Sequence, residues 1–276
     1  MNLITLTTTA MVSFRFLSGS ALAVSLFSIF VSSTPNLNDR SHGSLEHLVP
    51  RNGTTRTTWK FGVVLFPKLI ILDFQGPMEL LGFLAKGFPS QTNPAWPFSS
   101  YEFEFDYLAE SLDPVVPNVG PAIIPTKTFS QVNGTQYDII LVPGGPGTRP
   151  AVISPTVVEF VKHQTPGLQY LLSVCTGAWV LANAGVLEGK NATTNKAAFA
   201  QIRNETSKGI NWIPKARWVV DGNTWTSSGV TAGMDMANAF IKYLVGPEFA
   251  TKAVNTVELR AVEQDDDPFA EVYGLA

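Results

Sequence analysis

The chain contains a single cysteine, Cys175, among 276 residues. It therefore cannot form an internal disulfide, and the thiol is either a small buried hydrophobe or a group kept for chemistry. Histidine is almost as scarce, with His42 and His47 in a polar stretch near the N-terminus and His163 in a segment of helical periodicity. None of the three is placed to pair with Cys175, so a papain-like or glutaminase-like mechanism is not supported.

An excess of positive charge is also lacking. The 19 Lys and Arg residues are balanced by 22 Asp and Glu residues, the formal net charge is −3, and the basic residues form no dense cluster. Binding to a phosphate backbone needs such a cluster, so we expect no nucleic-acid partner. Because 45% of the residues are apolar, the chain can bury a large core, and we expect one large domain.

One long apolar run lies near the N-terminus. It extends from Phe16 to Ser33, follows Arg15 and ends in small residues, which predicts a signal peptide over residues 1–33 and therefore secretion. Glycosylation on that route is predicted at the Asn-X-Thr triplets that begin at Asn52, Asn133, Asn191 and Asn204. The alternative is an uncleaved signal anchor, although the run is short for a membrane-spanning helix. Otherwise we expect no stable membrane association.

From residue 59 onward, apolar strand patterns alternate with amphipathic helix patterns. This order is typical of an α/β fold, a mostly parallel sheet with helices on both faces, here over residues 59–262. Residues 34–58 predict a flexible leader, and residues 263–276 predict an acidic, solvated tail. Strands are expected at 61–66, 101–108, 137–142 and 168–174, a hairpin at 218–226, and helices at 78–84, 157–164, 231–245 and from the cysteine to residue 183.

Cys175 lies where a predicted strand turns into a predicted helix. We expect a sharp turn at this point, with the thiol exposed at the sheet edge above the first free N–H groups of the helix. The positive potential at a helix start lowers a cysteine pKa, so the pattern favours a nucleophilic thiolate.

Two other segments are expected at the same edge, because open α/β sheets bind ligands at the carboxyl ends of their strands. Gly144 and Gly145 end one strand, and their N–H groups, with that of Thr176, are predicted to form an oxyanion pocket; the alternative is an ordinary glycine turn. Asp73 precedes a predicted helix and is either an N-cap or, with its pKa raised by burial and a nearby thiolate, a general acid. Glu79 is a second candidate for the acid.

In their order and spacing, these motifs resemble the ThiJ/PfpI superfamily. The matching segments span residues 59–260 and include Leu72–Pro77, Val142–Gly145, Ser173–Gly177, Ala192–Thr194 and Ser228–Asp235. Within the superfamily, the chain is most similar to isonitrile hydratases and to the sensor domains of AraC-type regulators.

The resemblance implies a flavodoxin-like sandwich, often dimeric, with Cys175 as nucleophile, Asp73 in the acid position and Thr176 after the cysteine. Two positions depart from the pattern. Many peptidase-like and glyoxalase-like members have histidine where this chain has Thr176, and some hydratase-like members have it where this chain has Asn195. We expect no DNA-binding domain after residue 276, and hence no regulator role.

Three functions remain open at this stage. The first is hydration of an isonitrile to an N-substituted formamide by Cys175 and Asp73, without imidazole, metal or other cofactor. The second is a glutathione-independent glyoxalase, in which the thiolate adds to an aldehyde and one carboxylate moves a proton between carbons. The third is a redox-sensing or chaperone-like protein with an oxidisable cysteine. The two enzymatic functions imply a small-molecule substrate, and the resemblance implies a homodimer.

Overall fold

Seven strands form one sheet in residues 56–276, the part of the chain that the computed structural model describes. They are β1 (Thr57–Val64), β2 (Tyr101–Ala109), β3 (Lys127–Thr128), β4 (Ile139–Val142), β5 (Tyr170–Ser173), β8 (Trp218–Asp221) and β9 (Thr224–Ser227). Their order across the sheet is β3-β2-β1-β4-β5-β9-β8, and all neighbours are parallel except β8 and β9. A separate parallel pair consists of β6 (Asn191–Ala192) and β7 (Asn211–Trp212).

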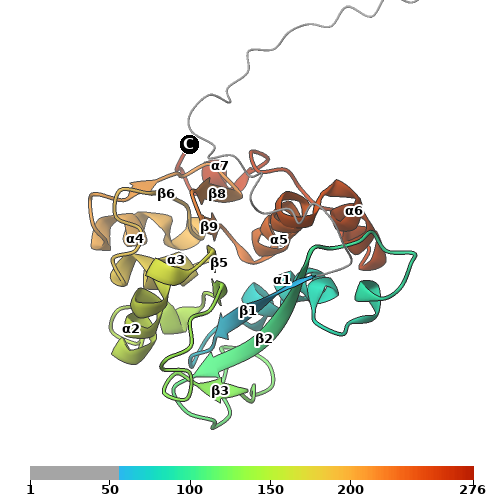
Figure 1. Ribbon diagram of the computed structural model, residues 1–276. Coiled ribbons are helices and arrows are strands. Elements are labelled where there is room, and N and C mark those ends of the chain that lie inside the picture. Colours follow the sequence, from blue (N-terminus) through green and yellow to red (C-terminus); the bar gives the residue numbers. More distant parts are fainter. Residues whose placement is uncertain (1–55) are drawn as a thin grey trace, which may run out of the picture. The chain divides into compact units, whose positions relative to one another are not determined.

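Helices cover both faces of this sheet (Figure 1). They are α1 (Ile71–Leu81), α2 (Pro155–Gln164), α3 (Gly177–Asn183), α4 (Phe199–Glu205), α5 (Val230–Val245), α6 (Pro247–Thr256) and α7 (Phe269–Val272). Short 3-10 helices lie at Gly82–Leu84, Pro89–Gln91, Pro146–Thr148, Thr165–Gly167 and Lys196–Ala198. On one face α1 packs against α5 and α5 against α6, whereas α2 and α3 pack together on the other. The predicted α/β sandwich is confirmed.

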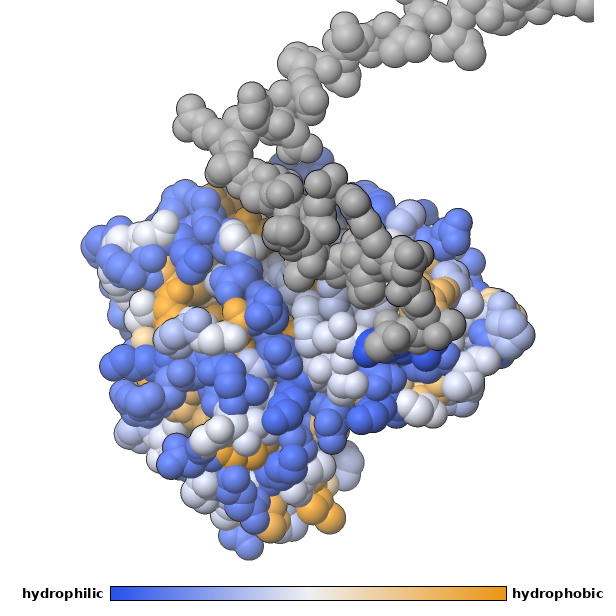
Figure 2. Space-filling model, viewed as in Figure 1, coloured by the Kyte–Doolittle hydropathy of each residue, from blue (hydrophilic) through white to orange (hydrophobic). Residues whose placement is uncertain are grey.

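The central strands are buried on both sides because helices cover each face. All residues of β4 and β5 are buried, which explains why their sequences are almost continuous apolar runs. On the outside, hydrophilic residues cover most of the face seen in Figure 2, and hydrophobic residues form separate patches among them.

Helix α1 begins earlier than its sequence pattern predicts. It starts at Ile71 rather than at Met78, so Pro77 lies inside the helix and not in its first turn. Proline has no N–H to donate to the carbonyl of Asp73, but the helix persists because most of its residues are buried against the core. The apolar run before Asp73 has the pattern of a strand, so the sequence did not indicate that α1 begins within it. As a consequence, Asp73 lies in the first turn of α1.

The segment 263–276 differs from the predicted solvated tail. Asp267 is only 2% exposed, and its Oδ2 lies 3.2 Å from Nζ of Lys196, which is also buried. The carbonyl of Gln264 accepts a hydrogen bond from the backbone N–H of Arg217. A buried ammonium needs a carboxylate partner, so this ion pair holds the segment against the end of the sheet.

Candidate active site

Four adjacent strands end at one edge of the sheet. In spatial order, β1 leads to the segment that carries Asp73, β4 to Gly144, β5 to Cys175 and β9 to Ser228. All four strands are parallel, so their carboxyl ends lie at the same edge. The topology therefore brings together residues that lie far apart in the sequence.

The backbone at Cys175 makes the predicted sharp turn. Its φ angle is 59°, in the left-handed region that residues other than glycine rarely occupy. Two hydrogen bonds hold this conformation: the Cys175 N–H donates to the Ser227 carbonyl at 3.1 Å, and the Thr194 hydroxyl donates to the Cys175 carbonyl at 2.9 Å. The Ala192–Thr194 match to the superfamily was the only sequence signal for Thr194, and Ser227 had none.

Asp73 is completely buried beside the cysteine. Its Oδ2 accepts a hydrogen bond of 3.0 Å from the N–H of Gly144, while Oδ1 has no partner in regular hydrogen-bond geometry within residues 56–276. The carboxyl group and the Cys175 thiol are close enough to change each other's pKa. A methyl group on Gly144 would lie 2.8 Å from Oδ2 of Asp73, 2.8 Å from Cβ of Cys175 and 2.6 Å from the N of Thr176. These three groups thus surround Gly144.

Burial dominates the electrostatics of the pair. It raises the pKa of Asp73 from 3.8 to about 7, although the Gly144 N–H and the thiol act in the opposite direction. Burial, and then the charge of Asp73, also raise the pKa of Cys175 above its ordinary value, against weaker lowering by the N–H and hydroxyl of Thr176. At neutral pH the sulfur therefore keeps its proton.

This result corrects two predictions about the thiol. Cys175 is 4% exposed rather than exposed at the sheet edge, and its pKa is raised rather than lowered. The start of α3 supplies less positive potential than predicted, because the N–H of Gly177 donates to the carbonyl of Val174. The groups that lower the pKa of the sulfur are the N–H and hydroxyl of Thr176, and their effect is smaller than that of burial.

The predicted oxyanion pocket is also corrected. The N–H of Gly144 is bound to Asp73, and the N–H of Gly145 donates to the hydroxyl of Thr176 at 2.9 Å. Neither N–H is free to receive a developing oxyanion. Instead they hold the acid and the Thr176 side chain in place, and the Thr148 hydroxyl, which the sequence did not indicate, adds a 2.9 Å hydrogen bond to Thr176.

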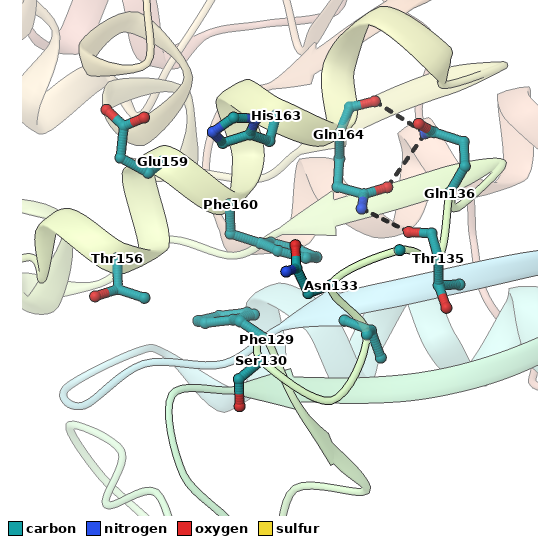
Figure 3. Close-up of a pocket in the computed structure, with 12 residues that line it drawn as sticks. Phe129, Ser130, Asn133, Thr135, Gln136, Thr156, Glu159, Phe160, His163 and Gln164 are labelled. Atoms are coloured by element: carbon teal, nitrogen blue, oxygen red, sulfur yellow. Dashed lines mark hydrogen bonds between the residues drawn. The ribbon is translucent and has the colours of Figure 1, made fainter.

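The second candidate acid, Glu79, is exposed, and its Oε1 accepts a hydrogen bond from Gln75. His163 lines a cavity of about 580 Å³ between α2 and the loop 129–136, together with Glu159 and the stacked rings of Phe129 and Phe160 (Figure 3). This cavity includes neither Cys175 nor Asp73 in its wall. His163 is the histidine within residues 56–276, and it lies in the wall of this cavity rather than beside the thiol.

The sequence of the chain is similar to those of known enzymes. The chain is 34% identical to isonitrile hydratase from Pseudomonas putida over 192 residues, which cover 69% of this chain and 74% of the relative. It is 25% identical over 142 residues to the glutathione-independent glyoxalase DJR-1.2 of Caenorhabditis elegans, covering 51% of this chain and 74% of the relative.

The prediction of a signal peptide, secretion and glycosylation is wrong, because these relatives are intracellular proteins and give no indication of any of the three. The signal-anchored alternative is wrong for the same reason. The segment on which both were based, residues 1–33, lies outside the described residues. Within residues 56–276, no helix is both long enough and apolar enough to span a membrane.

A solved structure has a similar fold and belongs to the same family as these relatives. A ThiJ/PfpI family protein from Pseudomonas syringae has a TM-score of 0.60 and 26% identity, covering 82% of this chain and 84% of its own. Members of this family commonly process small molecules and form dimers. The model of the DJ-1/PfpI family matches residues 91–243, and the resemblance predicted from the motifs is thereby confirmed. The chain belongs to the DJ-1/PfpI family.

Proposed function

We propose that this protein is a cysteine-dependent hydratase that converts an isonitrile into an N-substituted formamide. Cys175 is the nucleophile, and Asp73 carries the proton. The observation that supports this most is the buried thiol–carboxyl pair around Gly144, which has the two groups that the reaction needs and no imidazole. The 34% identity to an isonitrile hydratase supports the same reaction.

The pair holds one proton in its reactive form. Above pH 7 Asp73 is ionised, whereas Cys175 keeps its proton because its pKa is raised well beyond that of Asp73. A carboxylate beside a thiol is a base within reach of the proton it must remove. Transfer of that proton to Asp73 gives a thiolate on Cys175 and a protonated Asp73. The total number of protons on the pair does not change.

In the first step the thiol adds across the terminal carbon of the isonitrile. The Cys175 sulfur forms a bond to that carbon, and the proton that left the sulfur passes from Asp73 to the same carbon. The carbon–nitrogen triple bond becomes a double bond, so the product is a thioimidate attached to Cys175. The Thr176 N–H, which favours negative charge on the sulfur, stabilises the charge that develops during transfer.

In the second step water adds to the thioimidate carbon. Asp73, again ionised, accepts a proton from water and gives it to the nitrogen, so that carbon carries hydroxyl, sulfur and amine. This intermediate collapses as the carbon–sulfur bond breaks, and the hydroxyl proton returns through Asp73 to Cys175. The products are the free thiol and the formamide. The net reaction is the addition of one water molecule to the isonitrile.

The small accessible surface of Cys175 restricts the electrophile. With 4% of the residue exposed, only a slender group can approach the sulfur. The reacting carbon of an isonitrile ends a linear two-atom group and meets this requirement better than a branched carbonyl does. We therefore expect narrow alkyl isonitriles to react faster than those with a bulky group next to nitrogen.

Incubation with a panel of alkyl and aryl isonitriles is expected to yield formamides, and Cys175→Ala is expected to reduce kcat/KM by at least about 1,000-fold because the nucleophile is lost. Formamide is measured by chromatography and mass spectrometry. His163→Ala is the matched control and is expected to retain full activity. Folded protein that produces no formamide from any member of the panel would refute the proposal.

The hydration rate is expected to rise with pH around an apparent pKa of about 7. Below this value Asp73 is protonated in the folded protein and cannot accept the thiol proton; above it Asp73 is ionised and the rate reaches a plateau. The measurement is kcat/KM from pH 5.5 to 9. A rate that falls as pH rises through 7 contradicts this assignment.

Similarity to a glyoxalase supports a second candidate, addition of Cys175 to a small aldehyde followed by proton movement through Asp73. Release of lactate from methylglyoxal without formamide production from isonitriles would favour it. The redox-sensing alternative is less well supported, because a buried, protonated thiol reacts slowly with peroxide.

The proposed scheme needs a small-molecule substrate and no cofactor. We also propose that the protein is a homodimer, because members of the family commonly are. Light scattering on the purified protein distinguishes a mass of two chains from a mass of one.

A further inference from the structure

A smaller cavity, of about 210 Å³, lies beside the loops that hold Cys175. Its wall includes Asn195 and Ser228, which directly follow the two residues hydrogen-bonded to the backbone of Cys175, Thr194 and Ser227. Cys175 itself is not part of the wall. The volume is below the roughly 300–1,000 Å³ of sites for drug-sized ligands, so the cavity suits a very small molecule.

Two buried polar side chains at this cavity have donors without partners. Arg217 is 6% exposed, and it uses Nε and Nη2 on Asp235 and Nη2 on Thr231, which leaves Nη1 without a partner within residues 56–276. The hydroxyl of Ser228, a residue 4% exposed, likewise has none in this part of the chain. Both residues line the cavity. Neither donor atom is among the fully enclosed unpaired polar atoms of residues 56–276, so both can donate a hydrogen bond to a molecule in the cavity.

The first turn of α5 adds backbone donors to the same wall. Its N-cap, Gly229, has no side chain that could cap the helix, and the first turn has no acidic residue. The amides of Val230 and Thr231 therefore have no partner within the helix, and they carry the positive end of its dipole. Together with Arg217 and Ser228, they favour an anion.

The charges in the wall indicate which kind of anion. Arg217 is paired with Asp235, and Lys196 with Asp267, so the two positive charges are already balanced by two negative ones. Such a wall can compensate one added negative charge through hydrogen bonds, but a dianion would remain largely uncompensated. The rim includes Phe269 and Tyr273, which are about half exposed and offer apolar surface.

We propose that this cavity binds a small organic carboxylate with an apolar body. The carboxylate group accepts hydrogen bonds from Nη1 of Arg217, the Ser228 hydroxyl and the first amides of α5, and the apolar body lies toward Phe269 and Tyr273. This inference goes beyond the hydration reaction and does not depend on it, because no residue of the cavity bonds to the substrate carbon or transfers its proton.

The test is a titration of the full chain, followed by nuclear magnetic resonance, with isobutyrate, its neutral analogue isobutyramide and inorganic phosphate. We expect isobutyrate to bind at least about tenfold more tightly than isobutyramide, because hydrogen bonds to a charged group are the stronger ones, and more tightly than phosphate. Equal affinity for isobutyrate and isobutyramide, tightest binding of phosphate, or no binding of isobutyrate overturns the proposal.

Two variants place the site. Ser228→Ala removes a hydroxyl that makes no hydrogen bond in the described chain, so it should fold normally and weaken isobutyrate binding about tenfold. Thr231→Glu puts a carboxylate in the first turn of α5, which helices tolerate well, and should abolish binding. Thr156→Glu, at the equivalent exposed position of α2, is the matched control and should bind normally. Unchanged isobutyrate binding by both cavity variants refutes the site. Cys175→Ser should bind isobutyrate as tightly as the parent does, and this result does not depend on whether the parent hydrates isonitriles.

Discussion

Asp73→Asn is expected to abolish hydration and, at the same time, to stabilise the protein at alkaline pH. Asparagine keeps an oxygen that can accept the Gly144 N–H, but it cannot take the thiol proton, so kcat/KM should fall by about 1,000-fold or more. Because the pKa of Asp73 is about 7 in the folded protein and 3.8 in its ordinary state, ionisation of this carboxyl group opposes folding as pH rises between these values.

The gain in stability should therefore depend on pH. The free energy of unfolding of Asp73→Asn is expected to exceed that of the parent by up to about 4 kcal/mol at pH 8, but by only about 2 kcal/mol at pH 5, from about 1.4 kcal/mol per pKa unit. Urea denaturation at both pH values measures this difference. Glu79→Gln, which changes an exposed carboxylate on the same helix, should alter neither activity nor stability appreciably. Equal stabilisation at the two pH values, or retained activity, contradicts the role of Asp73.

Gly144→Ala is expected to damage both the fold and the site. The added methyl group would lie within 2.6–2.8 Å of Thr176 N, Asp73 Oδ2 and Cys175 Cβ. The first and last of these atoms cannot move without the backbone, and Oδ2 is buried and held by the N–H of Gly144. Overpacking of this kind typically lowers the free energy of unfolding by about 1–3 kcal/mol. The carboxyl group and the sulfur would also be pushed apart, and a displacement of that size costs about 100-fold in kcat/KM.

Gly134→Ala provides the matched control, because a methyl group at Gly134 would meet no atom within 4 Å. Its stability should lie within about 0.5 kcal/mol of the parent, and its activity should be unchanged. If Gly144→Ala behaves like Gly134→Ala, the close packing of the thiol, the acid and the turn around Gly144 is not what positions the pair.

Features encoded locally could be predicted from the sequence. The continuous apolar runs of β4 and β5 and the antiparallel pairing of β8 with β9 through a turn at Gly222 follow from short-range patterns. The sharp turn at Cys175 was predicted for the same reason. Convergence of Asp73, Gly144 and Cys175 followed from one rule, that parallel strands end at a common edge.

Features that depend on distant contacts could not. The pKa of Cys175 is set by its burial and by Asp73, which lies more than a hundred residues earlier, and no local pattern reports either. The N–H of Gly144 is used by a carboxylate 71 residues away, so an oxyanion role was a reasonable but wrong inference. Asp267 was taken for a solvated charge because its partner, Lys196, is remote in sequence.

The central claim is that a buried pair holds one proton, that the sulfur of Cys175 keeps it at rest, and that Asp73 is ready to accept it. Infrared difference spectra of the parent against Cys175→Ser and against Asp73→Asn, recorded as pH is varied, observe the S–H group and the carboxylate separately. We expect the S–H band of Cys175 to persist above pH 8, while the carboxylate band of Asp73 appears with a midpoint near pH 7. A thiolate already present at pH 7, or an Asp73 that ionises near pH 4, would contradict the account.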